Sequence, residues 1–386
     1  KRKKMKILIC SDSFKETLEA TKVGEAIEKG LRKNKRWPKE KEITNMPLSD
    51  GGEGFLKTIQ MIIKRTQKTQ KIDIYEHTVT GPLPEQQVKA QYGVLNETTA
   101  IVEMAQAAGI EYLRKEQRNP MKTTTYGVGE LLKHIEETHK NVKHVIMGVG
   151  SSATNDGGVG ALQAMGMDIH MKQHHPNKKI TGEHLIQLLK KPTTNNFTKL
   201  TFDIACDVDT VFIGEKGATA IYGPQKGGTV TDLATLEKGM CHLAKIFNIQ
   251  TNQKGSGAAG GIAGTFQTIL GANLKKGIHL IAEMVNLDDA IQQNDIIFTG
   301  EGCYDASTSE GKLVSYIQQR CQAYSKPLYI ICGKQEQTAE NVFALRDAFD
   351  ERDCFQQTSH VLETLCSTIP FQINVETYLQ KVESSA

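Results

Sequence analysis

The sequence predicts a two-domain α/β protein, with a Rossmann- or flavodoxin-like doubly wound parallel sheet and a second α/β domain inserted into it. Short apolar runs alternate with amphipathic helical patterns in the first and last quarters of the chain, as in parallel sheets covered by helices. Between these quarters, several apolar runs are joined by short turns, a pattern typical of hairpins. The 386 residues are also enough for two domains.

The first quarter predicts strands at residues 7–10 and 41–48, a helix at 21–33 and a helix that begins after Gly54. The last quarter predicts a strand at 295–298, a helix at 312–323 and a strand at 328–332 closed by Gly333. The middle predicts strands at 71–80, 88–94, 98–104, 144–149 and 200–206 and a helix at 126–139, with 165–200 as a polar surface excursion. We therefore expect one discontinuous domain, residues 1–75 and 286–386, interrupted by an inserted domain at 76–285.

Charge and hydropathy exclude several classes of protein. The chain has 47 Lys and Arg against 44 Asp and Glu, a net charge of +3, so we expect no nucleic-acid partner. No apolar run approaches the ~20 residues of a spanning helix, so we expect no membrane partner. The eight cysteines contain no C-x-x-C pair, which favours reduced thiols and a cytoplasmic location.

Glycine marks the candidate binding loops. Nineteen of the 34 glycines lie in five stretches, residues 47–54, 148–160, 223–228, 255–264 and 299–312. Glycine permits positive φ angles and lets a ligand approach the main chain. Residues 148–160 follow a predicted strand and precede a predicted helix, an arrangement that presents backbone N–H groups to a phosphate. A tight turn with a serine cap explains the same pattern equally well.

Other polar and glycine positions extend this candidate phosphate site. Lys226 lies between glycines and could reach a phosphate, although an exposed turn lysine is the simpler explanation. Residues 255–264 leave no room for bulky side chains, so they bring the backbone close to a ligand or to another helix. The chain has neither a P-loop nor a G-x-G-x-x-G fingerprint, and a nicotinamide-dependent dehydrogenase is therefore not expected.

Acidic residues follow predicted strands at three places. Their side chains are Asp50 and Glu53, Glu301 and Asp305, and Asp207 and Asp209. Ligands of a doubly wound sheet bind at the carboxyl ends of its strands. Carboxylates there predict Mg²⁺ ligation or a general base, as in metal-assisted phosphoryl transfer. Helix capping also explains the first pair. His170, His174 and His175 lie in a Lys-rich stretch, where a surface loop is favoured over a metal site.

These motifs together resemble the class I glycerate kinases of bacteria, from about Met5 to the C-terminal region. The similar segments are SDSFKETLEA (11–20), PLSDGGEG (47–54), GPL (81–83), RNPMKTTTYGVGEL (118–131), GVGSSATNDGGVGALQAMG (148–166), ACDVDT (205–210), GATAIYGPQKGGT (217–229), GSGAAGGIAG (255–264) and TGEGCYDASTSEGK (299–312). Their number, order and spacing make the resemblance specific.

The resemblance implies an ATP-dependent kinase that phosphorylates D-glycerate with Mg²⁺, in a cleft between two α/β domains. Class I enzymes generally phosphorylate the 2-hydroxyl, so 2-phosphoglycerate is the implied product. The implied partners are the small molecules D-glycerate and ATP. A homodimer is compatible with the sequence, which neither requires nor excludes it.

Individual roles follow as hypotheses. Ser11, Asp12, Ser13 and Glu301 are predicted to bind glycerate, with Lys15 near its carboxylate or the transferred phosphoryl group. Asp50 and Asp305 are the candidates for general base and Mg²⁺ support, in either order, and Asp207 and Asp209 are further metal candidates. Lys312 either neutralises developing charge or caps Glu310. The predicted nucleotide and phosphate site consists of Ser151, Ser152, Thr154, Asn155, Lys226, Gly257, Gly260 and Gly261.

The sequence departs from the family pattern after residues 299–302. The family has arginine, isoleucine and aspartate there, and this chain has Cys303, Tyr304 and Asp305; Ala306 and Ser307 also replace the usual Ser-Gln. Losing the arginine removes a fork of donors suited to carboxylate or phosphate. This change is the reason to keep a kinase for another small hydroxy acid as an alternative. A non-catalytic nucleotide- or metabolite-sensing protein is a second alternative, although the acidic and lysine positions are present.

Overall fold

The structure is a computed structural model that describes residues 4–14, 17–48, 54–66, 70–172, 178–193, 198–305, 313–336 and 339–371. The chain divides into two compact units. Unit 1 consists of residues 1–50, 61–68 and 278–386, and unit 2 of residues 51–60 and 69–277. That these units are separate domains with boundaries near 75/76 and 285/286 stays a prediction.

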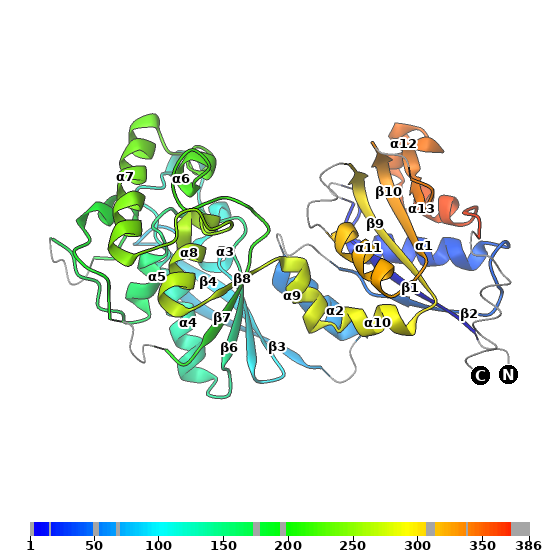
Figure 1. Cartoon of the computed structure of the whole chain (residues 1–386), viewed down its shortest axis with the longest axis horizontal. Coiled ribbons are helices and arrows are strands. Elements are labelled where there is room, and N and C mark those ends of the chain that lie inside the picture. The colour runs from blue at the N-terminus through cyan, green and yellow to red at the C-terminus, as the bar shows by residue number, and fades with distance from the viewer. Residues whose placement is uncertain are drawn as a thin grey trace. The chain divides into compact units, whose positions relative to one another are not determined.

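Unit 1 contains a five-stranded parallel sheet in the order β11-β10-β9-β1-β2. Its strands are β1 (Met5–Ser11), β2 (Lys41–Asn45), β9 (Ile296–Tyr304), β10 (Leu328–Gln335) and β11 (Val342–Ala344). In Figure 1 the blue strand β1 lies beside the yellow β9, and β9 beside the orange β10, because both ends of the chain build this sheet. In chain order within the unit, the arrangement is 2-1-3-4-5, the flavodoxin-like order, and its topological switch point lies between β1 and β9.

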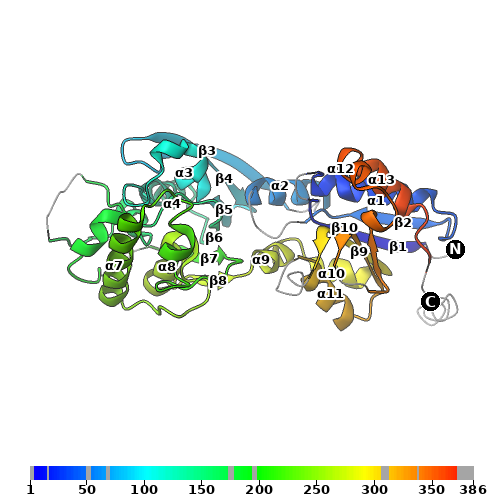
Figure 2. The ribbon, with the colours of Figure 1, turned by 90° about the horizontal axis from the view of Figure 1, so that it is seen from above.

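Helices cover both faces of this sheet. They are α1 (Ala20–Lys33), α10 (Leu287–Gln293), α11 (Leu313–Ala323), α12 (Glu351–Gln356) and α13 (Thr358–Cys366), with the short η6 (Leu345–Asp347) after β11. Figure 2 shows α1, α12 and α13 on one face and α10 and α11 on the other. The apolar side of α1, with Val23, Ile27 and Leu31, is fully buried. Burial on both faces explains why β1 and β10 read as continuous apolar runs.

Unit 2 contains a six-stranded sheet whose strands follow one another in chain order (Figure 2). They are β3 (Ile72–Thr80), β4 (Gln87–Leu95), β5 (Thr99–Glu103), β6 (His144–Gly148), β7 (Thr201–Ala205) and β8 (Asn273–Lys275). Strands β3, β4 and β5 pair antiparallel, and β5 then begins a parallel half that continues through β6 and β7 to β8. The predicted hairpins therefore form, and they continue into a parallel half.

Helices and 3₁₀ turns of unit 2 surround this sheet. The helices are α3 (Ala105–Ala108), α4 (Tyr126–Thr138), α5 (Val159–Ala164), α6 (Ala218–Tyr222), α7 (Val230–Phe247) and α8 (Ile262–Leu270). The 3₁₀ turns are η1 (Ile110–Tyr112), η2 (Lys115–Gln117), η3 (Gly182–Gln187) and η4 (Ala258–Gly261). Two helices, α2 (Phe55–Thr66) and α9 (Gly277–Met284), carry the chain across the division between the units.

The predicted α/β class with predominantly parallel sheets is confirmed, and three local details differ. β9 runs to Tyr304, six residues past the predicted end, because its second half pairs with β10 as far as Gln335. The expected polar excursion buries Ile180, Leu185 and Leu188 in the core of unit 2. The short strands β8 and β11 were not predicted, because no apolar run in the sequence indicated them. Within the described residues, no helix has the length and apolar character needed to cross a membrane.

Candidate functional site

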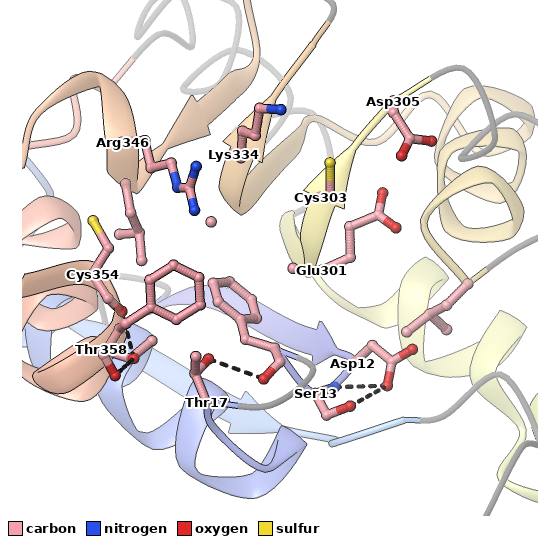
Figure 3. A pocket seen from close by; sticks show the side chains of 16 residues that line it. Asp12, Ser13, Thr17, Glu301, Cys303, Asp305, Lys334, Arg346, Cys354 and Thr358 are labelled. Carbon is pink, nitrogen blue, oxygen red and sulfur yellow. Dashed lines mark hydrogen bonds between the residues drawn. The ribbon is translucent and has the colours of Figure 1, made fainter. Parts of the chain in front are cut away.

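A cavity of about 360 Å³ opens in unit 1 at the carboxyl ends of β1, β9 and β10 (Figure 3). Its floor is the switch point, where Ser11 of β1 is paired with Gly300 of β9. On one side of that point the chain leaves β1, and on the other side β9 continues to Tyr304. This edge of a doubly wound sheet is where such folds bind their ligands.

Four of the predicted glycerate and catalytic residues line this one cavity. They are Asp12, Ser13, Glu301 and Asp305. The backbone N–H of Asp12 donates to the Gly300 carbonyl at 3.0 Å, which fixes the turn after β1 against β9. Ser13 donates to Asp12 Oδ1 from its backbone N–H at 2.6 Å and from its hydroxyl at 3.3 Å. Figure 3 shows the carboxylates of Glu301 and Asp305 pointing toward one another.

Ser11 supports this cavity and does not line it. Its side chain is fully buried, and its hydroxyl donates to the Ala20 carbonyl at 3.4 Å, at the start of α1. Its own carbonyl accepts the N–H of Leu48 at 3.0 Å. Three further predicted residues, Lys15, Asp50 and Lys312, lie outside the described residues.

Two cations in the cavity were missed by the sequence reasoning. Lys334 follows Gly333 at the end of β10, and Arg346 lies on η6. The strand closed by Gly333 was a usable signal for Lys334, since a strand end in this sheet predicts a ligand position. Arg346 had no such signal, because it follows a three-residue strand.

Cys303 also lines the cavity. Burial, followed by a hydrogen bond with the Asp305 carboxylate, raises the pKa of the Cys303 thiol above its usual value. A protonated thiol is a poor nucleophile. Cys303 therefore contributes a neutral hydrogen-bond donor beside Asp305 rather than a positive charge.

The candidate phosphate loop lies in unit 2, at the carboxyl ends of β6 and β7. A cavity of about 350 Å³ there is lined by Ser151, Ser152, Asp207 and Lys226, among others. Ser151 has a φ of 53°, in the left-handed region that non-glycine residues rarely adopt. A neighbouring cavity of about 420 Å³ shares Ser151 and adds the carboxylates of Glu103 and Glu111.

Lys226 is a buried residue, in contrast to an exposed turn lysine. Only 5% of it is accessible, and its ammonium donates to Ser152 Oγ at 2.9 Å and to the Thr154 carbonyl at 2.6 Å. Burial lowers the pKa of Lys226 to about 7. Near neutral pH the side chain therefore exchanges between charged and neutral forms, and an approaching anion would favour the charged form.

Thr154 and Asn155 are fully buried and do not line that cavity. Asn155 Nδ2 donates to Thr219 Oγ1 at 3.1 Å. Among the described residues, neither Thr154 Oγ1 nor Asn155 Oδ1 has a hydrogen-bond partner. Buried polar atoms without partners are rare in folded proteins, so this loop carries unmet hydrogen-bonding capacity.

Asp156, which the sequence reasoning did not single out, braces the same loop. Its carboxylate accepts the backbone N–H and hydroxyl of Thr125, both at 2.8 Å, and the N–H of Gly158 at 3.0 Å. Burial raises the pKa of Asp156, and those hydrogen bonds oppose the shift. The glycine-rich loop is thus held in shape by a carboxylate inside the protein.

The predicted glycines Gly257, Gly260 and Gly261 face the protein's own chain. A Cβ on Gly257 would lie 2.0 Å from the Val211 carbonyl oxygen, and one on Gly260 would lie 2.1 Å from that of Thr154. A Cβ on Gly261 would lie 2.6 Å from the Met240 side chain. These contacts agree with the alternative in which the glycines allow close packing within the protein. The neighbouring Ala258 and Ala259 line the cavity.

The predicted metal candidates of unit 2 are engaged by the protein. Asp207 Oδ1 accepts the N–H of Gly277 at 2.9 Å, and Asp209 pairs with the ammonium groups of Lys254 at 2.7 Å and Lys276 at 3.8 Å. These lysines do not favour a divalent cation at Asp209. No group of three or more His, Cys, Asp or Glu side chains in the described ranges is placed to hold a metal ion. His170 pairs with Asp168 at 3.0 Å, and His174 and His175 lie outside those ranges.

Comparison with known proteins gives one consistent result. A sequence model of the glycerate kinase family matches residues 7–369. The chain is 36% identical over 345 residues to a glycerate kinase of Halalkalibacterium halodurans, covering 87% of each. It is 34% identical over 339 residues to a glycerate 2-kinase of Escherichia coli, covering 85% of each. A crystal structure of a putative glycerate kinase 2 from Salmonella typhimurium LT2 matches with a TM-score of 0.76 and 32% identity, covering 98% of this chain and 99% of that one.

Proposed function

The chain belongs to the glycerate kinase family, and from this premise we propose that it transfers the γ-phosphoryl group of ATP to the C2 hydroxyl of D-glycerate, giving 2-phosphoglycerate. ATP-dependent phosphorylation of glycerate is the activity of the family. The choice of the C2 hydroxyl is supported by the relative of 34% identity named glycerate 2-kinase. The observation that carries the proposal is the cavity of unit 1, where Asp12, Ser13, Glu301 and Asp305 come together.

Glycerate is proposed to bind in the unit 1 cavity. Phosphoryl transfer needs a positioned acceptor hydroxyl and a base that accepts its proton. Asp305 lines the cavity and is proposed as that base, with Asp50 as the alternative. Asp12 would accept a hydrogen bond from the second hydroxyl of glycerate, and Ser13 would donate one to it. Cys303 donates to Asp305 and so holds this carboxylate in place.

The phosphates of ATP are proposed to bind at the glycine-rich loop of unit 2. Ser151, Ser152 and Lys226 line its cavity, and Thr154 and Asn155 shape the buried side of the loop. The Lys226 ammonium is held by two oxygen acceptors. A triphosphate near it would raise its pKa above 7, so nucleotide binding is proposed to fix it in the charged form.

Mg²⁺ is proposed to accompany ATP, and the described residues whose chemistry suits it are Glu301 and, if Asp50 is the base, Asp305. Their two carboxylates point toward one another in an open cavity (Figure 3). Mg²⁺ is commonly held by one or two carboxylates together with phosphate oxygens and waters. When bound, the ion would neutralise charge on the transferred phosphoryl group. Every other step falls to the protein's own side chains, which bind and orient the acceptor.

The location and partners are proposals of the same kind. All eight cysteines are free, and six of them are buried, as expected for a protein of the reducing cytoplasm. The proposed partners are D-glycerate and ATP, and a homodimer stays open to a measurement of mass in solution.

A kinase for another small hydroxy acid is the second candidate function. It is favoured by Cys303, which lines the cavity at the position where the resemblance implies an arginine. A panel of hydroxy acids assayed for ADP release, followed by NMR of the phosphorylated product, separates the candidates. D-glycerate as the best substrate with phosphate on C2 supports the proposal. A better substrate elsewhere in the panel contradicts it, and tight ATP binding without turnover favours a sensor.

A further inference from the structure

The unit 1 cavity has charges of both signs on different elements. Three carboxylates, those of Asp12, Glu301 and Asp305, come from the ends of β1 and β9. Two cations, Lys334 and Arg346, come from β10 and η6. A hydroxy acid is itself two-ended, with an anionic carboxylate and neutral hydroxyls. The charges therefore suggest which end of the acceptor lies where.

Arg346 is held in place for such a contact. Its guanidinium pairs with Glu351 at 2.5 Å and lies over the ring of Phe355, with 5.3 Å from Cζ to the ring centre. About a third of the Arg346 side chain is exposed, and Figure 3 shows its guanidinium pointing into the cavity. A guanidinium has five N–H donors, more than one carboxylate partner uses. Glu351 and Phe355 orient the group while other donors face the cavity.

Lys334 is less suited to the same task. Its ammonium pairs with Glu336 at 2.7 Å, and about half of its side chain is exposed. An ammonium is a strongly hydrated point charge on a flexible stem, whereas a guanidinium binds a carboxylate through two parallel hydrogen bonds. Of the two cations, Arg346 has the geometry for recognising a carboxylate.

We propose that Arg346 binds the carboxylate of the acceptor and selects hydroxy acids over neutral polyols. The proposal rests on the function proposed above and adds the residue that determines specificity for a carboxylate. Arg346 and Cys303 line the same cavity, so the guanidinium from η6 supplies there a positive charge that the neutral thiol does not. With its carboxylate at Arg346, the acceptor has its hydroxyls toward the acidic residues at the ends of β1 and β9.

The test compares D-glycerate with D-glyceramide, its neutral amide, in wild type and Arg346→Met. Loss of a charge-assisted hydrogen bond is worth about 10- to 100-fold in affinity. We expect the KM for D-glycerate to rise by about that factor, while the KM for ATP and the weak kcat/KM for D-glyceramide change less than about threefold. Arg346→Lys should fall between the two proteins. An unchanged ratio of kcat/KM for glycerate to that for glyceramide in Arg346→Met overturns the proposal.

Two controls separate binding from a structural effect. Glu351→Gln removes the charge of the residue that orients Arg346 but keeps an oxygen acceptor and the guanidinium, so it should lose clearly less of the preference for glycerate than Arg346→Met. Arg352→Met removes an exposed arginine of α12, the helix that also contains Glu351. Arg352 does not line the cavity, so this variant should behave as wild type. If Glu351→Gln loses the preference as fully as Arg346→Met, Arg346 acts only through its ion pair and the proposal is wrong.

A binding measurement distinguishes failure of this inference from failure of the proposed function. Calorimetric titration of D-glycerate, without ATP, reports affinity whether or not the protein turns over. Weaker binding by Arg346→Met than by wild type supports the inference even if glycerate is not phosphorylated. Equal binding by the two proteins contradicts the inference. If wild type nevertheless phosphorylates glycerate, the proposed function is still supported.

Discussion

The two candidate sites use their polar residues in opposite ways. In unit 1, carboxylates and cations line an open cavity at the switch point of a parallel sheet. In unit 2, Lys226, Asn155 and Asp156 are buried and bonded within the protein. The glycine-rich loop therefore owes much of its composition to packing, while the acidic strand ends of unit 1 face the space where a ligand would bind. Glycine content therefore indicates an unusual backbone conformation, whereas the accessible polar side chains of unit 1 indicate a candidate ligand site.

The largest expected effect is on Asp305. Asp305→Asn keeps the shape of the side chain but removes the proposed base, and general-base catalysis is worth about 10²- to 10⁴-fold. We expect kcat to fall by that factor in a steady-state assay at saturating ATP and Mg²⁺ across pH. Asp353→Asn, an exposed position on α12, is the matched control. Wild-type turnover with an unchanged pH profile in Asp305→Asn would show that another residue is the base.

Gly260 tests the packing role of the glycine-rich segment in unit 2. Gly260→Ala places a Cβ 2.1 Å from the Thr154 carbonyl oxygen at a φ of +71°, so both a clash and backbone strain result. We expect a loss of about 2–4 kcal/mol in the free energy of unfolding, measured with urea. Gly271→Ala, at a φ of +68° with nothing within 4 Å, should cost only the strain of about 1 kcal/mol. Equal losses for the two variants would contradict the packing account.

Lys226 predicts a pH-dependent stability. Its pKa is about 7 in the folded protein and 10.5 ordinarily, so between these values the unfolded chain binds more protons than the folded chain. The contribution of Lys226 to stability therefore rises with pH across this window and is flat below it. Lys226→Met removes that contribution.

The quantity to compare is the free energy of unfolding of Lys226→Met minus that of wild type. This difference should be largest near pH 7 and should fall by a few kcal/mol toward pH 10, because wild type gains stability over that range and the variant does not. The two hydrogen bonds lost with the ammonium add a constant offset that does not change with pH. Lys245→Met, an exposed lysine of α7, should show no such trend. A difference that is independent of pH would mean that the folded pKa of Lys226 is not lowered.

The smallest expected effect is at Cys303. Cys303→Ala removes the thiol donor to Asp305, which stabilises the ionised carboxylate. The acid limb of the pH profile of kcat should shift to higher pH by a fraction of a pH unit. At pH values below the pKa of the base, kcat should therefore fall two- to fivefold. Cys303→Ser keeps a donor and should restore the wild-type profile. A profile that does not move in Cys303→Ala would contradict a role for this hydrogen bond.

The sequence predicted the parts of the candidate site that depend on neighbouring strand ends. Asp12 and Glu301 are 289 residues apart, yet both follow apolar runs that pair as parallel strands, and the carboxyl ends of such strands meet at one edge of a sheet. The same argument located Asp305, although β9 extends further than its apolar run because its polar half pairs with β10.

The parts that depend on distant packing could not be predicted. Arg346 follows a strand of three residues, which carries too little apolar periodicity to be recognised. The burial of Lys226 depends on Ser152 and on Thr154, more than seventy positions away, and nothing in residues 223–228 indicates those contacts. Gly260 faces a carbonyl of another loop, so its sequence surroundings fit packing and ligand binding equally well.

Hydrogen–deuterium exchange in the presence of D-glycerate alone tests most directly whether the unit 1 cavity is the acceptor site. The account predicts slower exchange in peptides that contain residues 11–14, 300–305 and 342–358, and no change in peptides from 148–160. A nonhydrolysable ATP analogue alone should slow exchange in 148–160. Slower exchange in 148–160 with D-glycerate, without any change in the unit 1 peptides, would contradict the account.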